Sequence, residues 1–283
     1  MAGHHELIDL NYARRGMVDW LHVNGIDYHP KLDQIVLSVH HFSEIWIIDH
    51  STTTAEAAGH RGGRSGKGGD LLYRWGNPAT YRMGTFRDQR LFAQHDARWI
   101  EPGQPGEGNI MIFNNGQRRA DGSYSSVDEI TTPINPKGGY EKGADAFGPV
   151  KSAWSYTAPN KSDFFSTNIS GAHRLSNGNT MICSGAPGIL FEVTANGEKV
   201  WEYVNPFSRT GGGPRQGGRQ GRSQPNSQFG GGPLRNQGGQ NGPRGGFGGP
   251  RRGPGGPGGG RPTFRATRIA LDHPALKGRK LAE

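Results

Sequence analysis

The sequence is poor in cysteine, in long apolar runs and in hydrophobic residues generally. Its 283 residues include a single cysteine, Cys183, so an internal disulfide and a paired-cysteine metal site are excluded. No apolar run has the length of a membrane-spanning helix, and residues 1–15 lack the apolar core of a signal peptide. Taken alone, this start predicts either a cytoplasmic protein or a chain that begins after its true start.

Acidic residues are missing from one segment, 209–261, which consists almost entirely of Gly, Arg, Pro, Gln and Asn. The segment holds nine of the 33 basic residues, and the other 24 equal the 24 acidic residues of the chain. The net charge of +9 therefore belongs to this segment and gives no reason to expect nucleic-acid binding by the rest. Because only 32% of the chain is hydrophobic, we expect residues 207–262 to be a disordered linker. An RNA-binding Gly/Arg tract is the alternative, with only Phe229 and Phe247 available to stack on bases.

Strand signals recur through the remainder of the chain, and no stretch keeps a helical period for more than about two turns. Asn-Gly pairs at 177–178 and 196–197 predict tight hairpins, because both central residues of such turns need positive φ. The predicted strands fall into three groups of four: 22–28, 32–39, 44–49 and 70–75; 96–100, 109–113, 125–131 and 151–156; 172–175, 180–183, 189–194 and 199–204. A last strand is predicted at 263–271.

Repeated units of four short antiparallel strands are typical of β-propeller blades, with a β-sandwich as the alternative. Propellers usually have about four to eight blades. We therefore expect an all-β fold consisting of a partial propeller, with three to four blades of a larger parent. The predicted boundaries are a remnant of a preceding blade at 1–16, blades at 17–206, the linker at 207–262, and a final strand and tail at 263–283. Aromatic pairs on the last strand of each unit are expected to pack one blade on the next: Tyr73 and Trp75, Trp154 and Tyr156, Trp201 and Tyr203.

A histidine stands at or near the first strand of each unit, at His22, His95 and His173. The first strand of a propeller blade is innermost, so equivalent positions would converge on the central channel. A cluster of three imidazoles is suited to binding an oxyanion and to nucleophilic or acid–base chemistry. A zinc site formed by the same three side chains is the alternative, since catalytic zinc keeps three protein ligands.

Several runs resemble the bacterial arylsulfate sulfotransferase family: DWLHVNGIDY at 19–28, QHDARWI at 94–100, NIMIFNNG at 109–116 and SGAHRLSNGNTMI at 170–182. The likeness covers most of residues 4–206 and also 264–279. Members of this family are six-bladed propellers of the periplasm. They move a sulfuryl group from one phenol to another through a transiently sulfated histidine, without a nucleotide donor. The resemblance thus implies a periplasmic or secreted enzyme that needs no cofactor and no metal.

The resemblance also implies roles for individual residues. It places the nucleophile at His173, supporting histidines at His22 and His95, and an oxyanion-binding arginine at Arg118 or Arg119. Further candidates for substrate binding are Asn24, Asn114 and His40. The expected partners are an aryl sulfate donor and a phenolic acceptor, with no nucleic acid and no membrane span, and a homodimer is left open. The alternative function is a non-catalytic propeller fragment that serves as a ligand- or partner-binding scaffold.

Overall fold

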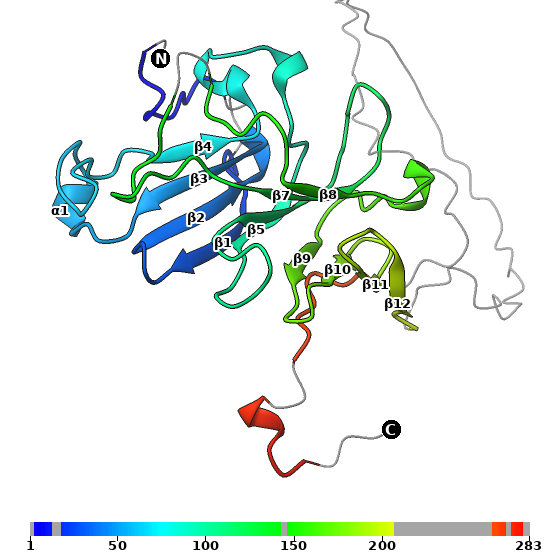
Figure 1. Cartoon of the computed structure of the whole chain (residues 1–283). Helices are drawn as coiled ribbons and strands as arrows, with labels where there is room; N and C mark the ends of the chain where they lie inside the picture. The colour runs from blue at the N-terminus through cyan, green and yellow to red at the C-terminus, as the bar shows by residue number, and fades with distance from the viewer. Residues whose placement is uncertain (1–2, 13–17, 143–145, 207–261, 270–272, 280–283) are drawn as a thin grey trace, which may run out of the picture. The chain divides into compact units, whose positions relative to one another are not determined.

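The computed structural model describes residues 3–12, 18–142, 146–206, 262–269 and 273–279 (Figure 1). The strands form three antiparallel sheets, and within each sheet neighbouring strands follow one another in sequence. The first sheet contains β1 (Val23–His29), β2 (Gln34–Val39), β3 (Glu44–Asp49) and β4 (Tyr73–Trp75). The second contains β5 (His95–Trp99), β6 (Ile110–Asn114), β7 (Ser126–Ile130) and β8 (Trp154–Tyr156). The third contains β9 (Gly171–Arg174), β10 (Thr180–Ser184), β11 (Ile189–Val193) and β12 (Lys199–Val204).

Helical structure in the described residues is confined to single turns. These are α1 (Thr54–Ala57) and the 3-10 turns η1 (His40–Phe42), η2 (Pro78–Tyr81), η3 (Phe86–Asp88), η4 (Lys161–Asp163) and η5 (Pro274–Leu276). The all-β prediction is therefore confirmed, as are the twelve strands in three groups. Their hairpins follow from local chemistry, since Gly178 and Gly197 adopt φ of +86° and +81°, which costs other residues strain.

The prediction of a last strand at 263–271 is wrong for the part that the structure describes, because residues 262–269 form no strand. Thr263 N–H donates to the carbonyl of Gly185 at 2.9 Å, and the carbonyl of Phe264 accepts from Ser170 N–H at 3.2 Å. Gly185 follows β10 and Ser170 precedes β9, so this segment crosses the ends of the two strands instead of pairing along an edge. The linker predicted at 207–262 lies outside the described residues, except for its last position.

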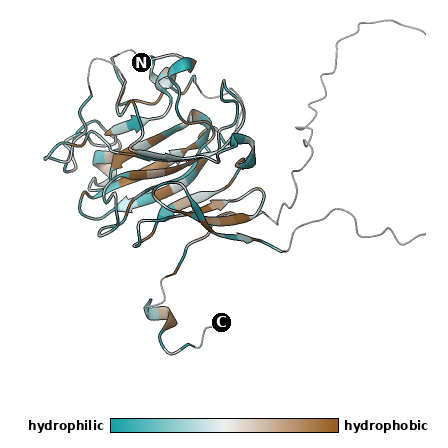
Figure 2. Ribbon diagram, turned by 45° about the vertical axis from the view of Figure 1, so that its right-hand side comes forward, coloured by the Kyte–Doolittle hydropathy of each residue, from teal (hydrophilic) through white to brown (hydrophobic). Residues whose placement is uncertain are grey.

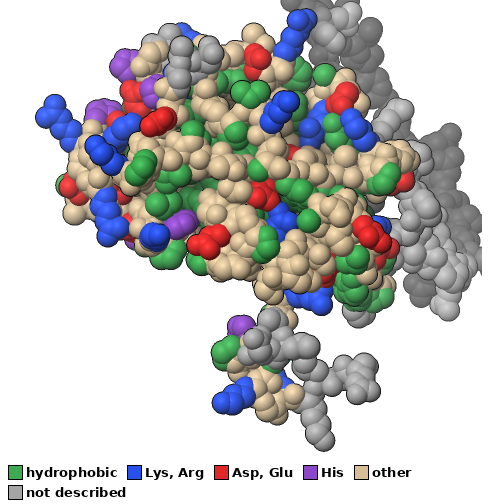
Figure 3. All heavy atoms as spheres, in the orientation of Figure 1, with side chains coloured by type: hydrophobic (Ala, Val, Ile, Leu, Met, Phe, Trp, Pro, Cys, Tyr) green, Lys and Arg blue, Asp and Glu red, His purple; other side chains and the backbone are tan. Residues whose placement is uncertain are grey.

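Hydrophobic cores lie between successive sheets, and the hydrophobic residues follow the strands (Figure 2). The aromatic pairs on the fourth strands contribute to these cores in the first two sheets. Tyr73 and Trp75 are buried between sheets one and two, and Tyr156 is buried between sheets two and three. By contrast, Trp201 and Tyr203 on β12 are 42% and 44% exposed. Hydrophobic side chains gather on the surface where β12 lies (Figure 3). The packing prediction is confirmed for the first two pairs, whereas no sheet within the described part of the chain packs against the third pair.

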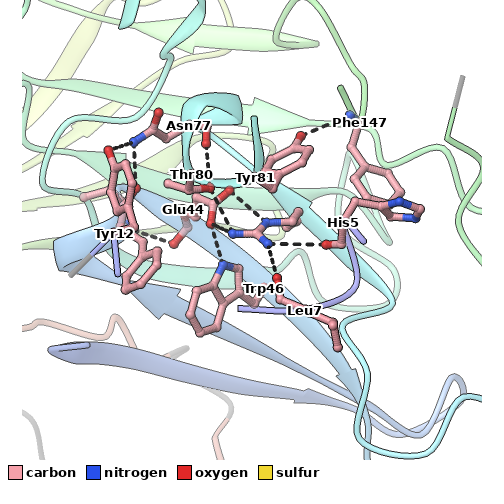
Figure 4. Close-up of polar contacts among 12 residues, drawn as sticks. His5, Leu7, Tyr12, Glu44, Trp46, Asn77, Thr80, Tyr81 and Phe147 are labelled. Carbon is pink, nitrogen blue, oxygen red and sulfur yellow. Dashed lines mark hydrogen bonds and ion pairs between the residues drawn. The ribbon is translucent and has the colours of Figure 1, made fainter. Parts of the chain in front are cut away.

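The far face of the first sheet is closed by the N-terminal segment through a buried ion pair (Figure 4). Glu44 and Arg74 are both fully buried, with Arg74 Nη2 at 2.5 Å and Nε at 3.1 Å from the two carboxylate oxygens. Arg74 Nη1 also donates to the carbonyl of Leu7 at 2.9 Å, and its guanidinium lies 4.5 Å from the ring centroid of Tyr81. These bonds fix the N-terminal segment beside the first sheet, and residues of both contribute to the site described next.

Candidate active site

The histidines predicted to match across the repeats do not occupy equivalent positions in the first two sheets. The carbonyl of Leu21 accepts the backbone bond that closes the turn after β2, and the carbonyl of Phe92 accepts the corresponding bond after β6. Asn24 follows Leu21 by three residues, and His95 follows Phe92 by three residues. Asn24 is therefore the residue of the first sheet that matches His95. His22 lies two residues earlier, so the prediction of matched positions is wrong here.

In the third sheet the predicted histidine also misses the matching position, but it lies later along the strand instead of earlier. Arg98 of β5 pairs with Met111 of β6, and His173 of β9 pairs with Met181, which holds the same place in β10. His173 therefore matches Arg98 and lies three residues beyond the position of His95. No ring contact joins His173 to another histidine among the described residues. Its role as nucleophile stays a prediction without geometric support.

Four other imidazole rings do meet at the ends of the first two sheets. His40 is central, because its ring centroid lies 5.0 Å from that of His22, 5.1 Å from His41 and 5.5 Å from His95. The rings of His22 and His41 are stacked at 5.2 Å. At these separations two protonated rings would repel strongly, so the cluster disfavours multiple positive charges. Of the three histidines predicted to converge, His22 and His95 thus meet through the ring of His40, whereas His173 does not join them.

His95 is fixed by hydrogen bonds from both ring nitrogens. Nδ1 donates to Asn115 Oδ1 at 2.7 Å, and Nε2 accepts from the backbone N–H of Ile169 at 3.2 Å. The ring is buried, and this burial lowers the pKa of His95 despite the opposing bond to Asn115. A neutral ring whose two nitrogens are both engaged has none left for a ligand. This geometry therefore gives no support to direct substrate contact by His95, whose catalytic role stays a prediction.

His22 is oriented by a carboxylate. Its Nδ1 is hydrogen-bonded to Asp19 Oδ2, and its backbone N–H donates to Asp19 Oδ1 at 3.0 Å. The bond to His22 lowers the pKa of Asp19, which therefore stays ionised. With Nδ1 engaged, Nε2 is the nitrogen of His22 that remains for proton exchange.

His40 and His41 each leave a buried Nδ1 atom without a hydrogen-bond partner among the described residues. Buried polar atoms almost always have partners, so two neighbouring exceptions indicate a place for a bound group. Burial, together with the neighbouring histidines, lowers the pKa of His40 to about 4. The ring of His40 is accordingly neutral at neutral pH, with a free lone pair.

A cavity of about 460 Å³ opens beside His40 and His41. This volume is within the range of small-molecule sites. Its wall also includes Arg118, for which the described residues provide no ion pair or hydrogen bond. Four aromatic side chains complete it: Tyr12, Trp20, Phe86 and Phe92. A site with imidazoles, a guanidinium and aromatic rings is suited to a ligand that has an aromatic ring and a negative charge.

The backbone around this cavity is strained at several positions. His22, Ser43, Ala93 and Arg118 adopt φ between 50° and 63°, which is uncommon for residues with a side chain. Such conformations cost roughly 1–3 kcal/mol each and concentrate at functional sites. Of these four, Ser43, Ala93 and Arg118 line the cavity itself, and His22 lies beside it.

The structure separates the two candidate arginines. Arg118 lines the cavity, whereas the guanidinium of Arg119 donates to Ser126 Oγ at 2.7 Å and lies 4.5 Å from the ring centroid of Tyr124. Arg118 is therefore the arginine of the candidate site, and Arg119 is held by the protein.

The two candidate asparagines are also engaged elsewhere. Asn114 is fully buried, accepts from the Phe92 N–H at 2.9 Å and donates to the carbonyl of Arg90 at 2.8 Å. Asn24 donates to the carbonyl of Gln94 at 2.8 Å. Neither lines the cavity, so a role for them in substrate binding gains no support from this geometry.

The zinc alternative lacks a ligand set. Within the described ranges, no group of three or more His, Cys, Asp or Glu side chains is placed to hold a metal ion. In the same residues, no helix combines the length and apolar character needed to span a bilayer.

Three successive four-stranded antiparallel sheets, each following the last along the chain, define a protein built of blade-like repeats. The chain belongs to the arylsulfotransferase (ASST) family, whose model matches residues 5–210. No curated protein matches the chain.

Solved structures similar to the chain include a protein of unknown function from Bacteroides caccae, with a TM-score of 0.36 and 13% identity over 68% of this chain and 47% of that one. A streptogramin B lyase has a TM-score of 0.30 and 14% identity over 65% and 55%. Virginiamycin B lyase from Staphylococcus aureus has a TM-score of 0.31 and 14% identity over 69% and 58%. The chain thus spans about half the length of these proteins.

Proposed function

We propose that the cavity beside His40 and His41 binds an aryl sulfate and transfers its sulfuryl group to a phenol. The observation that carries this proposal is the pair of unpartnered imidazoles in a cavity that also presents Arg118 and four aromatic rings. The rings supply contacts for both the donor and the acceptor phenol. Arg118 and the neighbouring imidazoles supply donors for the sulfuryl oxygens.

In the first step, the lone pair of a neutral histidine attacks sulfur, forming an N–S bond while the bond from sulfur to the aryl oxygen breaks. We assign this role to His40, which is neutral and contacts all three other rings. The phenolate leaves with the electron pair and takes a proton from His41. The mechanism requires His41 to begin the cycle protonated, and the carboxylate of Asp19 is near enough to interact with it.

In the second step, the acceptor phenol returns a proton to His41 as its oxygen attacks sulfur. The N–S bond then breaks, and both histidines regain their starting protonation states. His22 stacks on His41 and is oriented by Asp19, so it holds the proton carrier in position. His95 packs against His40 as a fixed neutral ring.

The test is release of nitrophenol from nitrophenyl sulfate, with and without an added phenol, together with the intact mass of the protein under acceptor-free conditions. We expect a mass increase of one sulfuryl group in the wild type and none in His40→Ala. His173→Ala should retain both label and turnover. Loss of both in His173→Ala, with full activity in His40→Ala, would transfer the nucleophile role to His173. Binding of aryl sulfate without label or turnover would indicate the scaffold function instead.

The role of His41 has its own kinetic signature. A proton donor matters most for a poor leaving group, so His41→Ala should slow turnover of phenyl sulfate by about 10²–10⁴-fold and that of nitrophenyl sulfate far less. Equal loss with both substrates would argue against proton transfer by His41.

The proposal extends to assembly and location. The three sheets act as propeller blades, and exposed Trp201 and Tyr203 on β12 are where a further blade or a second copy would pack. Sedimentation of the wild type and of Trp201→Ser tests self-association through this strand. Family membership leads us to infer a periplasmic location, which fractionation of the producing cells would check.

A further inference from the structure

A second charged cluster lies where β5 meets the C-terminal segment 262–269. Oδ1 of Asp96 is 2.9 Å from Arg98 Nη2 and 3.0 Å from Arg265 Nη2. Asp96 is only 3% exposed. One buried carboxylate thus faces two guanidinium groups, which leaves one positive charge without a counterion in the cluster. None of the three residues lines the cavity of the proposed active site.

Arg265 Nη2 also donates to the carbonyl of Asn24 at 3.4 Å, but each arginine keeps one donor without an acceptor. The Nε atoms of Arg98 and Arg265 are buried and have no hydrogen-bond partner among the described residues. Oδ2 of Asp96 is buried and accepts no hydrogen bond from the described residues, so this oxygen pairs with neither Nε atom. Leaving a charged donor unpaired in a buried position is costly. The two guanidinium groups, as distinct from the carboxylate, therefore lack a negatively charged acceptor for these donors.

His173 is adjacent to this cluster and adds a neutral donor. Its Nε2 accepts from the backbone N–H of Arg268 at 3.3 Å, so a neutral ring carries its proton on Nδ1. Burial and the charge of Arg98 lower the pKa of His173 to about 4. The ring therefore stays neutral at neutral pH, and the described residues provide no partner for Nδ1.

We propose that Arg98, Arg265 and His173 bind a small oxyanion, a sulfate or a carboxylate, at a site separate from the active-site cavity. Two guanidinium groups offer directed pairs of donors, which fit the oxygens of such an ion. Arg265 belongs to the segment that crosses the ends of β9 and β10. A bound oxyanion consequently links this segment to β5 and balances the charge that Asp96 leaves unmatched.

The test is titration of the full chain with sulfate by calorimetry at low ionic strength, with acetate as the second ligand. Arg98→Gln and Arg265→Gln should each weaken binding of the preferred ion by about tenfold or more, because each removes a charge-assisted bond. Asp96→Asn should tighten binding, since it frees both arginines from their counterion. Lys161→Gln removes an exposed charge paired with Asp121 and serves as the matched control, with little change expected.

The two sites are distinguished with a variant of the cavity. His40→Ala combined with Arg118→Ala should keep the oxyanion site while losing sulfuryl transfer. Sulfate binding that disappears in this double variant and persists in Arg265→Gln would overturn the oxyanion site and leave the active-site proposal intact. Where Arg265→Gln folds poorly, Arg265→Lys keeps the charge but not the fork, and unchanged affinity in that variant would also count against the site.

Discussion

Asn115 fixes the tautomer of His95. Its Oδ1 accepts the proton on Nδ1 at 2.7 Å, while its Nδ2 donates to the carbonyls of Ser166 at 2.8 Å and Ile169 at 3.0 Å. Turning the amide over would lose all three bonds, so its orientation is determined by the protein. Ile169 N–H then occupies Nε2 of the same ring. This chain of bonds joins β5 to the loop before β9 and gives His40 a rigid wall.

We therefore predict that Asn115→Ala destabilises the fold. The substitution removes three side-chain hydrogen bonds and leaves two buried carbonyls unpaired, so the free energy of unfolding should fall by about 2–4 kcal/mol. Urea denaturation followed by tryptophan fluorescence measures this. Asn168→Ala, an exposed site nearby, should change stability by less than about 0.5 kcal/mol. Equal effects of the two variants would contradict the prediction.

Strand positions were predictable because the information is local. At 196–197, for instance, an Asn-Gly pair between two strand-forming runs fixes the hairpin of β11 and β12. Side-chain positions were less predictable because β5 and β1 contain register irregularities, between His95 and Arg98 and between Val23 and Gly25. One extra residue moves later side chains to the other face. Histidines matched by sequence alone therefore did not occupy matching positions, either for His22 or for His173.

The candidate site was predicted only in part. His22, His40 and His95 could be predicted because each histidine lies at or near a predicted strand end. Arg118, with Arg119 as the alternative, could be predicted only from the family resemblance. The aromatic wall of the cavity could not be predicted from the sequence. Its four residues come from segments without strand periodicity that meet only in the folded chain: Tyr12, Trp20, Phe86 and Phe92. One feature of the sequence did point to this wall: Trp20 follows Asp19 in the DWLHVN run, which is among the runs that resemble the family.

The buried pair Glu44–Arg74 should show strong coupling. Arg74→Met leaves a fully buried carboxylate without its counterion and should cost about 3–5 kcal/mol. Glu44→Gln combined with Arg74→Met removes both charges and should cost clearly less than the sum of the single variants. A double-mutant cycle in urea measures the coupling. The exposed pair Lys161–Asp121 is the control, with a coupling of about 0–1 kcal/mol. Similar coupling in both pairs would count against this account.

The aromatic wall of the cavity should affect substrate binding more than stability. Phe86 is 57% exposed in the free protein, so Phe86→Ala should change the free energy of unfolding by less than about 1 kcal/mol. If its ring packs on the bound phenol, KM for nitrophenyl sulfate should rise by about 5- to 20-fold, corresponding to roughly 1–2 kcal/mol. Ile134→Ala, partly exposed away from the cavity, is the matched control. An unaltered KM in Phe86→Ala would remove this ring from the substrate site.

Stability should depend on pH through two histidines whose pKa values are lowered. Burial, assisted by neighbouring charges, lowers the pKa of His40 and of His173 to about 4. In the unfolded chain an imidazole titrates near 6.5. Below pH 6.5 the unfolded state therefore binds protons that the folded state does not, so the free energy of unfolding falls as the pH drops towards 4. Below about pH 4 both states are protonated, and these two groups cause no further loss.

The size of the effect follows from the same linkage. Each unit by which folding lowers the pKa of a histidine corresponds to roughly 1.4 kcal/mol of unfolding free energy. Because the rings are partly exposed, we expect a total of only about 1–2 kcal/mol for each histidine. Urea denaturation at pH 7.5 and 4.5 measures the difference in unfolding free energy between the two conditions. His40→Gln and His173→Gln should each reduce that difference, because neither variant has a ring to protonate on unfolding. Asn168→Ala, at an exposed position without a titratable group, should leave it unchanged. A pH dependence that is the same in both histidine variants and the wild type would mean that neither ring is protected from protonation by the fold.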